Sequence, residues 1–548
     1  MTLAAARPHP YLPNLLRRVG LLRACALALA FMVGMPLLVI ALSWGEVNAE
    51  IWLHLAQTQL GRLLGNTLVL VLGVGVSVLL LGVPLAWFIA TCEFPGRKWF
   101  DVALMLPLAV PAYVMAFVLV GLLDYAGPVQ TLLRGWIGPS IAFSFRGTGA
   151  VVMVMSLVLY PYVYMLSRNA FLAQGREPLE AARVLGLGPL QGFLRVALPM
   201  ARPAIIAGLA LALMETLADF GAVAVFNYDT FTTAIYKAWY GFFNLQTAAQ
   251  LASMLLLIVL TGLYLERRGR GSARYYQSAR RRAKASRMPL QGYKAWLVSA
   301  WCGLVFVLAF LVPVGQLLVW ILQGAWQDLD ARYLGLVGHT LYLAAIAALI
   351  TVAAAFLLAL YRRSYKGALS GGIVRLATVG YALPGSVLAV GIMLSFNWLD
   401  GWAAQLQTAL GLAVQPVFVG GVLALLLAYT TRFLAAAFGP VETSLDRIRP
   451  SIPEAAAILG ARPAEIVRRI YLPMLTPGLL TAALLVFVDV MKEMPATLLM
   501  RPFGWDTLAV RIYEMTSEGL WQQAALPGLS IVLVGLVPVI ILVRRSAH

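Results

Sequence analysis

The chain contains many apolar stretches long enough to cross a lipid bilayer, and this feature restricts its fold more than any other. A membrane-spanning helix needs about 20 predominantly apolar residues. Ten uncharged apolar stretches reach that length, within residues 24–43, 63–92, 102–123, 147–167, 238–265, 295–327, 333–361, 376–399, 401–431 and 519–543. Two more, near 203–226 and 478–500, are equally apolar but contain acids. Because the whole chain is 61% hydrophobic and only 12% charged, we predict an all-α membrane protein with about 12 transmembrane helices.

The Lys and Arg residues, 41 in all, are distributed in a way that orients these spans. They gather at the N-terminus through Arg23, at the C-terminus, and in segments 91–101, 168–202, 266–294, 361–375 and 432–477. These segments alternate along the chain and so share one side, and basic loops stay cytoplasmic. We therefore expect both termini in the cytoplasm. The run 267–294 carries ten Lys or Arg, which we interpret as a positive-inside linker beside membrane lipid, with no nucleic-acid partner.

The second half of the chain repeats the first, with residue 454 corresponding to residue 180. The segment EAARVLGLGPLQGFLRVALP, residues 180–199, matches EAAAILGARPAEIVRRIYLP, residues 454–473, at nine of twenty positions. Each half has six spans, an even number, so both halves enter the membrane in the same direction as parallel repeats. An interface between such repeats is the usual place for a translocation path.

Both copies of this longest match fall in predicted cytoplasmic loops, between the fourth and fifth spans of each half. The run Glu-Ala-Ala favours a short helix, which Gly186 or Gly460 is expected to end and turn. Pro178 and Pro453 precede the runs and suit a helix start. We predict a small helical projection made twice, which suits docking to a partner that is itself twofold.

The pattern E-A-A-x(3)-G, followed by Leu-Pro, resembles the coupling loop of binding-protein-dependent ABC importer permeases. The resemblance implies a type I permease architecture in the bacterial inner membrane and docking to a homodimeric ABC ATPase. The docking residues would be Glu180, Ala181, Ala182, Gly186, Glu454, Ala455, Ala456 and Gly460. The resemblance covers two cores, 62–265 and 337–548. Segment 1–61 and the basic linker segment 266–336 would each add a further span, at 24–43 and 295–322.

The chain contains neither an ATPase nor a substrate-binding domain of its own. It lacks the G-x(4)-G-K-[ST] motif, and indeed any Gly-Lys pair, so it has no loop that cradles nucleotide phosphates. The predicted extracytoplasmic loops are too short to fold into a binding domain. The three cysteines and four histidines are scattered and form no metal motif. We expect a transport subunit, not an enzyme, without a cofactor; ATP and Mg would bind a separate ATPase, and a soluble protein would deliver the substrate.

Two spans carry paired acids, and these acids are the best indication of the substrate. Glu215 and Asp219 lie in the fifth span, and Asp489 and Glu493 lie at the corresponding positions of the eleventh. Their i,i+4 spacing is expected to place each pair on one helix face. Acids at membrane depth usually face a cavity or a partner, so we predict an acidic path for a cation, with Lys492 offsetting Asp489. The alternative is that these acids cap or join helices.

A closer resemblance concerns the same spans. The segments ETLADFGAVAVF, DTFTTAIYKAWY and DVMKEMPATLLMRPFGWDTLAVRIYE resemble ferric-iron importer permeases, which are fused double-length chains. This resemblance implies Fe3+ as the transported substrate, held only transiently. The same machinery for thiamine, polyamine or phosphonate stays open as an alternative. A secondary transporter or channel is disfavoured by the duplicated coupling loops.

A further repeat follows each acidic span. DTFTTAIY at 229–236 matches DTLAVRIY at 506–513. Both segments lie at the expected outer ends of the acidic spans, so we predict that Asp229, Tyr236, Asp506 and Tyr513 form an outer gate. The alternative is that the tyrosines anchor the chain at the membrane interface.

Overall fold

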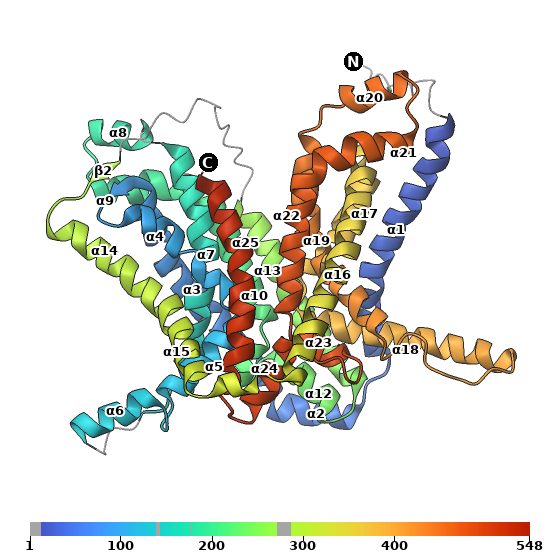
Figure 1. The fold of residues 1–548 in the computed structure, drawn as a ribbon, viewed down its shortest axis with the longest axis horizontal. Coiled ribbons are helices and arrows are strands. Elements are labelled where there is room, and N and C mark those ends of the chain that lie inside the picture. The colour runs from blue at the N-terminus through green and yellow to red at the C-terminus, as the bar shows by residue number, and fades with distance from the viewer. Residues whose placement is uncertain (1–12, 139–142, 176, 271–286, 548) are drawn as a thin grey trace. The chain divides into compact units, whose positions relative to one another are not determined.

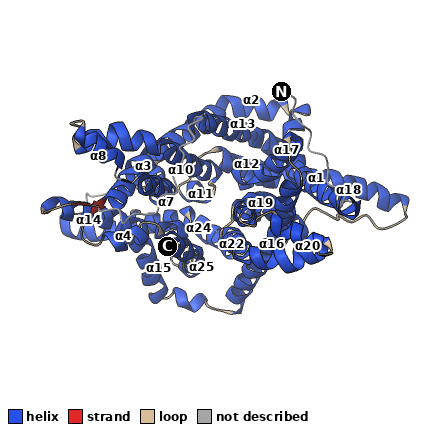
Figure 2. Ribbon diagram, turned by 90° about the horizontal axis from the view of Figure 1, so that it is seen from above, coloured by secondary structure: helices blue, strands red, loops and turns tan. Residues whose placement is uncertain are grey.

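The computed structural model describes residues 13–138, 143–175, 177–270 and 287–547. Its described residues form helices, with one two-stranded sheet that is the short pair shown beside α14 in Figure 2. The chain divides into two compact units: unit 1 is Met1–Leu42 with Gly338–Trp505, and unit 2 is Ser43–Val337 with Asp506–His548. The division does not follow the two halves of the sequence.

Unit 2 contains most of the first sequence half (Figure 1). In chain order its elements are α2 (Ala49–Thr58), α3 (Leu60–Thr91), β1 (Cys92–Glu93), α4 (Arg97–Ala103), α5 (Ala112–Leu123), α6 (Pro128–Ile137), α7 (Thr148–Gln174), α8 (Glu177–Val184), α9 (Pro189–Gly192), α10 (Leu198–Ala218), α11 (Gly221–Val225), α12 (Phe231–Tyr240), α13 (Leu245–Arg270), β2 (Met288–Pro289), α14 (Tyr293–Phe306), α15 (Val312–Leu322), α24 (Leu508–Ser517) and α25 (Ala525–Ala547).

Unit 1 contains the first helix and most of the second sequence half. Its elements are α1 (Pro13–Leu42), α16 (Ala331–Ser364, which begins in unit 2), α17 (Ala368–Thr378), α18 (Gly385–Ala409), α19 (Val422–Asp446), α20 (Ser451–Ile458), α21 (Pro463–Ile466), α22 (Leu472–Met491) and α23 (Pro495–Met500). We call residues 180–186 and 454–460, which carry the E-A-A-x(3)-G pattern, the two coupling segments. In both units a turn of wider π-helix joins the short helix after the coupling segment to the next long helix, at Phe193–Ala197 and Val467–Tyr471.

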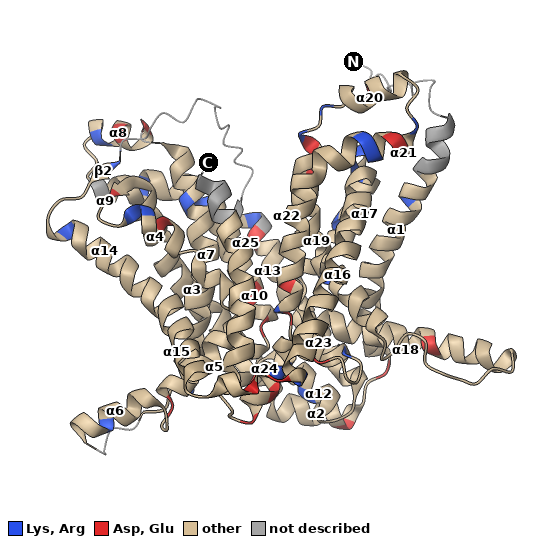
Figure 3. Ribbon diagram, in the orientation of Figure 1, with Lys and Arg blue, Asp and Glu red and all other residues tan. Residues whose placement is uncertain are grey.

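Eleven helices in the described part of the chain are long and apolar enough to cross a membrane. A shorter apolar helix, Ala525–Ile541 within α25, stands where the twelfth span is predicted. Figure 3 shows that the helix shafts are almost free of charge, whereas Lys and Arg gather near helix ends such as those beside α4 and α8. This pattern confirms a multi-pass membrane protein.

The core of unit 2 is a close pairing of α3 with α7 and of α7 with α10. Small residues make the approach possible. A Cβ atom added to Gly208 would lie 2.8 Å from the Val163 Cα, and one added to Gly82 would lie 2.9 Å from the Val163 Cβ. Because lipid tails are as apolar as leucine, helices in a membrane associate by such tight packing rather than by the hydrophobic effect.

Each extra span packs against helices of the other sequence half or of the neighbouring core. In unit 1, α1 lies against α17 and α18, where Gly391 leaves room for Pro36 and Ile40. In unit 2, α14 lies against α4 and α15 lies against α5, and the rings of Phe117 and Trp320 are stacked at 6.3 Å. The extra spans therefore pack against helices that are far from them in the sequence.

Candidate functional site

The first coupling segment is a short exposed helix that ends at a glycine. Helix α8 carries Glu180 and Ala181, both exposed, and Ala182, which is buried. Gly186 follows with a φ of +82°. Its N–H donates to the Arg183 carbonyl at 2.9 Å, and the Leu187 N–H donates to the Ala182 carbonyl at 3.0 Å. These two bonds form a Schellman cap, which a left-handed residue closes.

The second coupling segment repeats this geometry in unit 1. Glu454 and Ala455 are exposed on α20, Ala456 is half-buried, and Gly460 follows with a φ of +88°. The Gly460 N–H donates to the Ala457 carbonyl and the Ala461 N–H to the Ala456 carbonyl, both at 3.0 Å. A Cβ atom at Gly186 or Gly460 would meet nothing within 4 Å. Backbone conformation, not space, therefore requires glycine at both positions.

Each capped helix presents an apolar pair just before its glycine. Val184 and Leu185 are 88% and 81% exposed, and their counterparts in the repeat, Ile458 and Leu459, are 86% and 87% exposed. These large apolar side chains are exposed on helices outside the candidate membrane spans, and exposed apolar groups of this kind are available for contact with another protein. Sequence reasoning chose the Glu-Ala-Ala residues and missed these pairs, although they occur at matching positions of the repeat.

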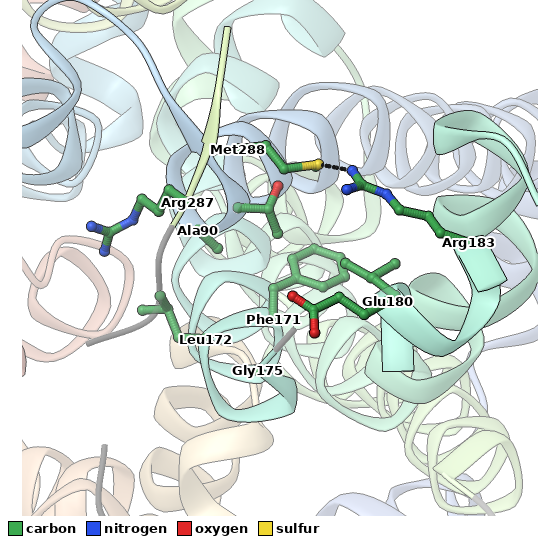
Figure 4. Close-up of a pocket in the computed structure, with 10 residues that line it drawn as sticks. Ala90, Phe171, Leu172, Gly175, Glu180, Arg183, Arg287 and Met288 are labelled. Carbon is green, nitrogen blue, oxygen red and sulfur yellow. Dashed lines mark hydrogen bonds between the residues drawn. The ribbon is translucent and has the colours of Figure 1, made fainter. Parts of the chain in front are cut away.

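A pocket lies beneath the first coupling helix (Figure 4). It is lined by Ala90, Thr91, Phe171, Leu172, Gly175, Leu179, Glu180, Arg183, Arg287 and Met288. The Arg183 side chain reaches across it to the Met288 sulfur. Met288 of the basic linker segment thus contacts the coupling helix directly.

The part of the linker that forms β2 also pairs with the segment that follows α3. Strand β2 pairs in parallel with β1, Cys92 beside Met288, and the Leu290 N–H donates to the Glu93 carbonyl at 3.0 Å. Arg97 lies 3.2 Å from the Glu93 carboxylate and Arg287 lies 3.8 Å from it. Burial and the nearby Arg97 cation lower the pKa of Arg287. Two cations thus share one carboxylate beneath α8.

The acidic spans differ from prediction, because both helices break between the paired acids. Helix α10 ends at Ala218 and α22 ends at Met491. Asp219 is the C-cap residue of α10, and Glu493 lies two residues beyond the end of α22, so each span breaks at the second acid of its pair. Gly221 and Pro495, which begin the next short helices, mark the breaks in the sequence.

Asp219 and Glu493 each cap the short helix after the break. Asp219 accepts a hydrogen bond from the Val223 N–H at 3.1 Å, at the start of α11. Glu493 accepts one from the Thr497 N–H at 3.0 Å, at the start of α23. A carboxylate at a helix N-terminus accepts hydrogen bonds from free N–H groups and interacts favourably with the positive end of the helix dipole. Both acids thus cap the short helix that follows the break.

In the second half of the chain, both acids of the span are paired with basic residues. Glu493, only 4% exposed, lies 2.8 Å from the Arg432 guanidinium of α19. Asp489 lies 3.0 Å from the Lys492 ammonium. Glu215 and Asp219 are half-buried in unit 2. Within the described residues, no group of three or more His, Cys, Asp and Glu is arranged to hold a metal ion.

The two predicted gate tyrosines meet within unit 2. The ring centroids of Tyr236 on α12 and Tyr513 on α24 are 6.0 Å apart, in an edge-to-face arrangement. Phe220, the residue after Asp219, contacts both rings, at 5.1 Å and 5.4 Å. Helices α12 and α24 lie at the end of unit 2 opposite to α8 (Figure 1). The contact between the tyrosines thus lies at the end remote from the coupling helix.

The two predicted gate aspartates have different surroundings. Asp229 accepts contacts from the Arg62 guanidinium at 2.7 Å and the Lys237 ammonium at 2.6 Å, which hold the start of α12 against α3. Asp506 is half-buried and precedes Thr507, which caps α24 through the Val510 N–H. A hollow beside the tyrosines is lined by residues that include Arg146, Asn227, Asp229, Lys237, Glu518 and Trp521.

The Asp229 pairs give a modest, salt-sensitive stability contribution. The Arg62 and Lys237 side chains are 58% and 61% exposed. Each pair therefore contributes at most about 1 kcal/mol. We expect Asp229→Asn to lower the thermal midpoint of the detergent-solubilised protein slightly at low salt. In about 1 M NaCl, where exposed charges are screened within about 3 Å, variant and parent should coincide. An equal difference at both salt concentrations would contradict this assignment.

The fold and these segments define a class of protein: a multi-pass membrane subunit with two matched short, exposed helices and two broken spans. The family model for the inner membrane component of binding-protein-dependent transport systems matches residues 82–265 and 351–547. The chain belongs to this family of ABC importer permeases, in a fused double-length form, and both matches fall within the predicted repeats.

Individual relatives differ in how much of the chain they match. The Fe(3+)-transport system permease protein FbpB 2 of Haemophilus influenzae is 28% identical over 528 residues, covering 94% of this chain and 97% of that protein. The molybdenum transport system permease protein ModB of Escherichia coli is 34% identical over 161 residues, 29% of this chain and 69% of that protein. The sulfate transport system permease protein CysT of Salmonella typhimurium is 33% identical over 150 residues, 26% of this chain and 50% of that protein.

Proposed function

We propose that this chain is the permease subunit of an ATP-driven importer for ferric iron. The observation that carries the proposal is the similarity to a permease named for Fe(3+) transport, which covers 94% of this chain and 97% of that protein and therefore extends over both halves. The molybdenum and sulfate permeases match less than a third of the chain. They share with it the permease core, but not the double-length arrangement.

The coupling helices are where ATP hydrolysis acts on the permease. The exposed pairs Val184–Leu185 and Ile458–Leu459 enter matching surfaces of a homodimeric ATPase subunit, which binds ATP and Mg. Two copies with the same capped geometry suit a twofold partner. Because the Schellman caps fix α8 and α20 as rigid short helices, movement of the ATPase is transmitted to α10 and α22 and not absorbed locally.

Ferric iron passes the breaks in the acidic spans, where oxygen atoms of the protein bind it only transiently. Ferric iron is a hard cation, and hard cations prefer oxygen ligands such as carboxylates and backbone carbonyls. Broken spans expose such carbonyls only where they line a cavity or are buried in protein. The sequence predicts four acids for this path, Glu215, Asp219, Asp489 and Glu493. Of these, Asp489 and Glu493 are each paired with a basic residue of their own half, so Glu215 and Asp219 are the acids proposed to meet the iron. Release requires weak binding, so no stable metal centre is expected in the resting permease.

The tyrosine contact is the outer gate, which a soluble binding protein opens when it docks. Tyr236 and Tyr513 come from the two repeats and meet at the end opposite to the coupling helix, as a closed gate would. Asp229 and Asp506 begin the two gate segments. Separation of α12 from α24 would open the path toward Phe220 and Asp219.

Uptake of radiolabelled ferric iron by cells that express the chain with its ATPase and binding protein tests the substrate. We expect ATP-dependent iron uptake that unlabelled molybdate and sulfate, in hundredfold excess, do not reduce. The control is an ATPase variant that binds but does not hydrolyse ATP. Uptake of labelled molybdate, thiamine, a polyamine or a phosphonate in place of iron would contradict the proposal.

A further inference from the structure

The two halves keep the same helix break but differ in the charges around it. Asp219 and Glu493 occupy the same position of the repeat, and each receives the N–H of the residue four places on. Three other positions differ between the halves. Arg432 and Lys492 of the second copy stand 274 residues after Val158 and Ala218 of the first, the spacing of the coupling segments. Gly385 is matched to Ala112 by the helix start, because each begins the helix after Pro384 or Pro111, a spacing of 273.

The Glu493 carboxylate is surrounded by donors of its own unit. Its Oε1 atom accepts from the Arg432 Nη1 at 2.8 Å and from the Ala496 N–H at 3.1 Å. Its Oε2 atom accepts from the Thr497 N–H at 3.0 Å. The single proton of the Thr497 hydroxyl is within reach of both Oε2, at 2.9 Å, and the Glu493 carbonyl, at 2.8 Å. Of the about four acceptor sites of a carboxylate, three are thus taken, one of them by a cation, which leaves little capacity for a passing cation.

Gly385 makes this arrangement possible. A Cβ atom at this position would collide with the Arg432 guanidinium and stand 2.6 Å from the Glu493 Oε1 atom. At the corresponding position the first copy has Ala112, and it has Val158 where the second has Arg432. Gly385, Arg432 and Glu493 therefore fit one another, and the three occur together in the second half.

Asp219 lies in a different setting. Its carboxylate accepts backbone N–H groups from the start of α11, those of Ala222 and Val223. Both donors come from one helix end and are uncharged, and the side chain is half-buried, in contrast to Glu493. The helix before the break ends in Ala218, where the second copy has Lys492. Asp219 therefore keeps acceptor capacity that Glu493 lacks, and its two donors bring no positive charge to offset the carboxylate when it is ionised.

We propose that the two halves have diverged in function, so that Asp219 contacts the transported cation and Glu493 is a positioning residue locked by Arg432. The acid that meets the cation then comes from the first half, while the second half supplies a rigid break whose acids are paired with Arg432 and Lys492. This inference rests on the proposed iron transport and specifies which of the duplicated acids takes part in it.

Matched neutral variants at the two positions test this divergence. Asp219→Asn should reach the membrane in parental amounts and lower the rate of iron uptake at least tenfold. Glu493→Gln and Arg432→Met should each reduce the amount of folded permease, because removal of one partner strands the other in a buried site. The double variant Arg432→Met/Glu493→Gln should regain the parental amount and transport iron within twofold of the parent.

Two outcomes would overturn the divergence. One is parental uptake by Asp219→Asn; the other is a double variant that is present in normal amounts but transports less than a tenth of the parental iron. Failure of the proposed function looks different, because the parent chain itself would then take up no iron. In that case the amounts of the single and double variants still decide whether Glu493 belongs to a closed ion pair. If the double variant regains the parental amount of folded permease, the Glu493–Arg432 ion pair is supported; if it does not, the ion pair is contradicted.

Discussion

Replacing both coupling glycines by valine, Gly186→Val with Gly460→Val, is expected to abolish the stimulation of ATP hydrolysis by the binding protein while the permease still inserts. Both glycines have a left-handed φ, +82° and +88°. A side chain there costs about 1–2 kcal/mol, and a β-branched one is disfavoured further. The Schellman caps would open, and the exposed pairs Val184–Leu185 and Ile458–Leu459 would lose their fixed direction.

The measurement is ATP hydrolysis by the reconstituted importer with and without loaded binding protein. The parent should be stimulated, and the double variant should remain at its basal rate. Gly188→Val is the matched control, because Gly188 is exposed in the same loop and its counterpart in the second copy is Arg462. A Cβ atom at Gly188 meets nothing within 4 Å, so this variant should couple normally. Parental stimulation of the double glycine variant would rule out rigid coupling helices.

Cross-linking the two gate segments is expected to stop iron uptake completely and reversibly. The rings of Tyr236 and Tyr513 are 6.0 Å apart, so cysteines at both positions are within reach of a short bifunctional thiosulfonate reagent. A link between α12 and α24 would hold the tyrosine contact closed. Uptake should fall to background after treatment and return when a reductant cleaves the link.

The cross-link is best made in a chain whose native cysteines are replaced by alanine. Cys92 and Cys302 are buried and Cys25 is half-buried, so the replacements remove side reactions at small cost. The single variants Tyr236→Cys and Tyr513→Cys serve as controls, and the reagent should leave their uptake unchanged. A cross-link shown by mass spectrometry that leaves uptake intact would assign the tyrosines to interfacial anchoring.

The coupling helices could be predicted because their signals are local. A Glu-Ala-Ala run that ends at glycine specifies a short helix and its cap with few tertiary contacts. The positive φ at Gly186 and Gly460 agrees with that prediction. The exposed apolar pairs were missed, because an apolar residue beside a membrane span does not reveal whether lipid, protein or water surrounds it.

The breaks in the acidic spans were missed for a related reason. The chain stays apolar through Phe220 and Met494, so hydropathy continues past the points where α10 and α22 end. Gly221 and Pro495 signal new helices, but tertiary contacts decide whether such residues break a span. Arg432 was placed outside the predicted span 401–431, whereas α19 continues through it to Asp446. Its buried partner Glu493 is distant in the sequence, and no local pattern pairs the two.

The packing of the extra spans also depends on contacts between residues that are far apart in the sequence. Helix α1 is apolar on most of its surface, and its sequence does not show that it packs against α17 and α18 rather than against its neighbours in the chain. In lipid, partner choice depends on the match of small and large residues between helices. The fit of Gly391 to Pro36 and Ile40 illustrates this, since it joins the first helix of the chain to a helix of the second half.

The central claim is that ATP hydrolysis on a separate subunit drives ferric iron through this chain. The most direct measurement is uptake of radiolabelled iron into proteoliposomes that contain the purified chain with its ATPase, with ATP inside and iron-loaded binding protein outside. We predict uptake that requires both ATP and the binding protein and that the Gly186→Val/Gly460→Val variant lacks. Iron entry that is equally fast without ATP, or in that variant, would contradict the account.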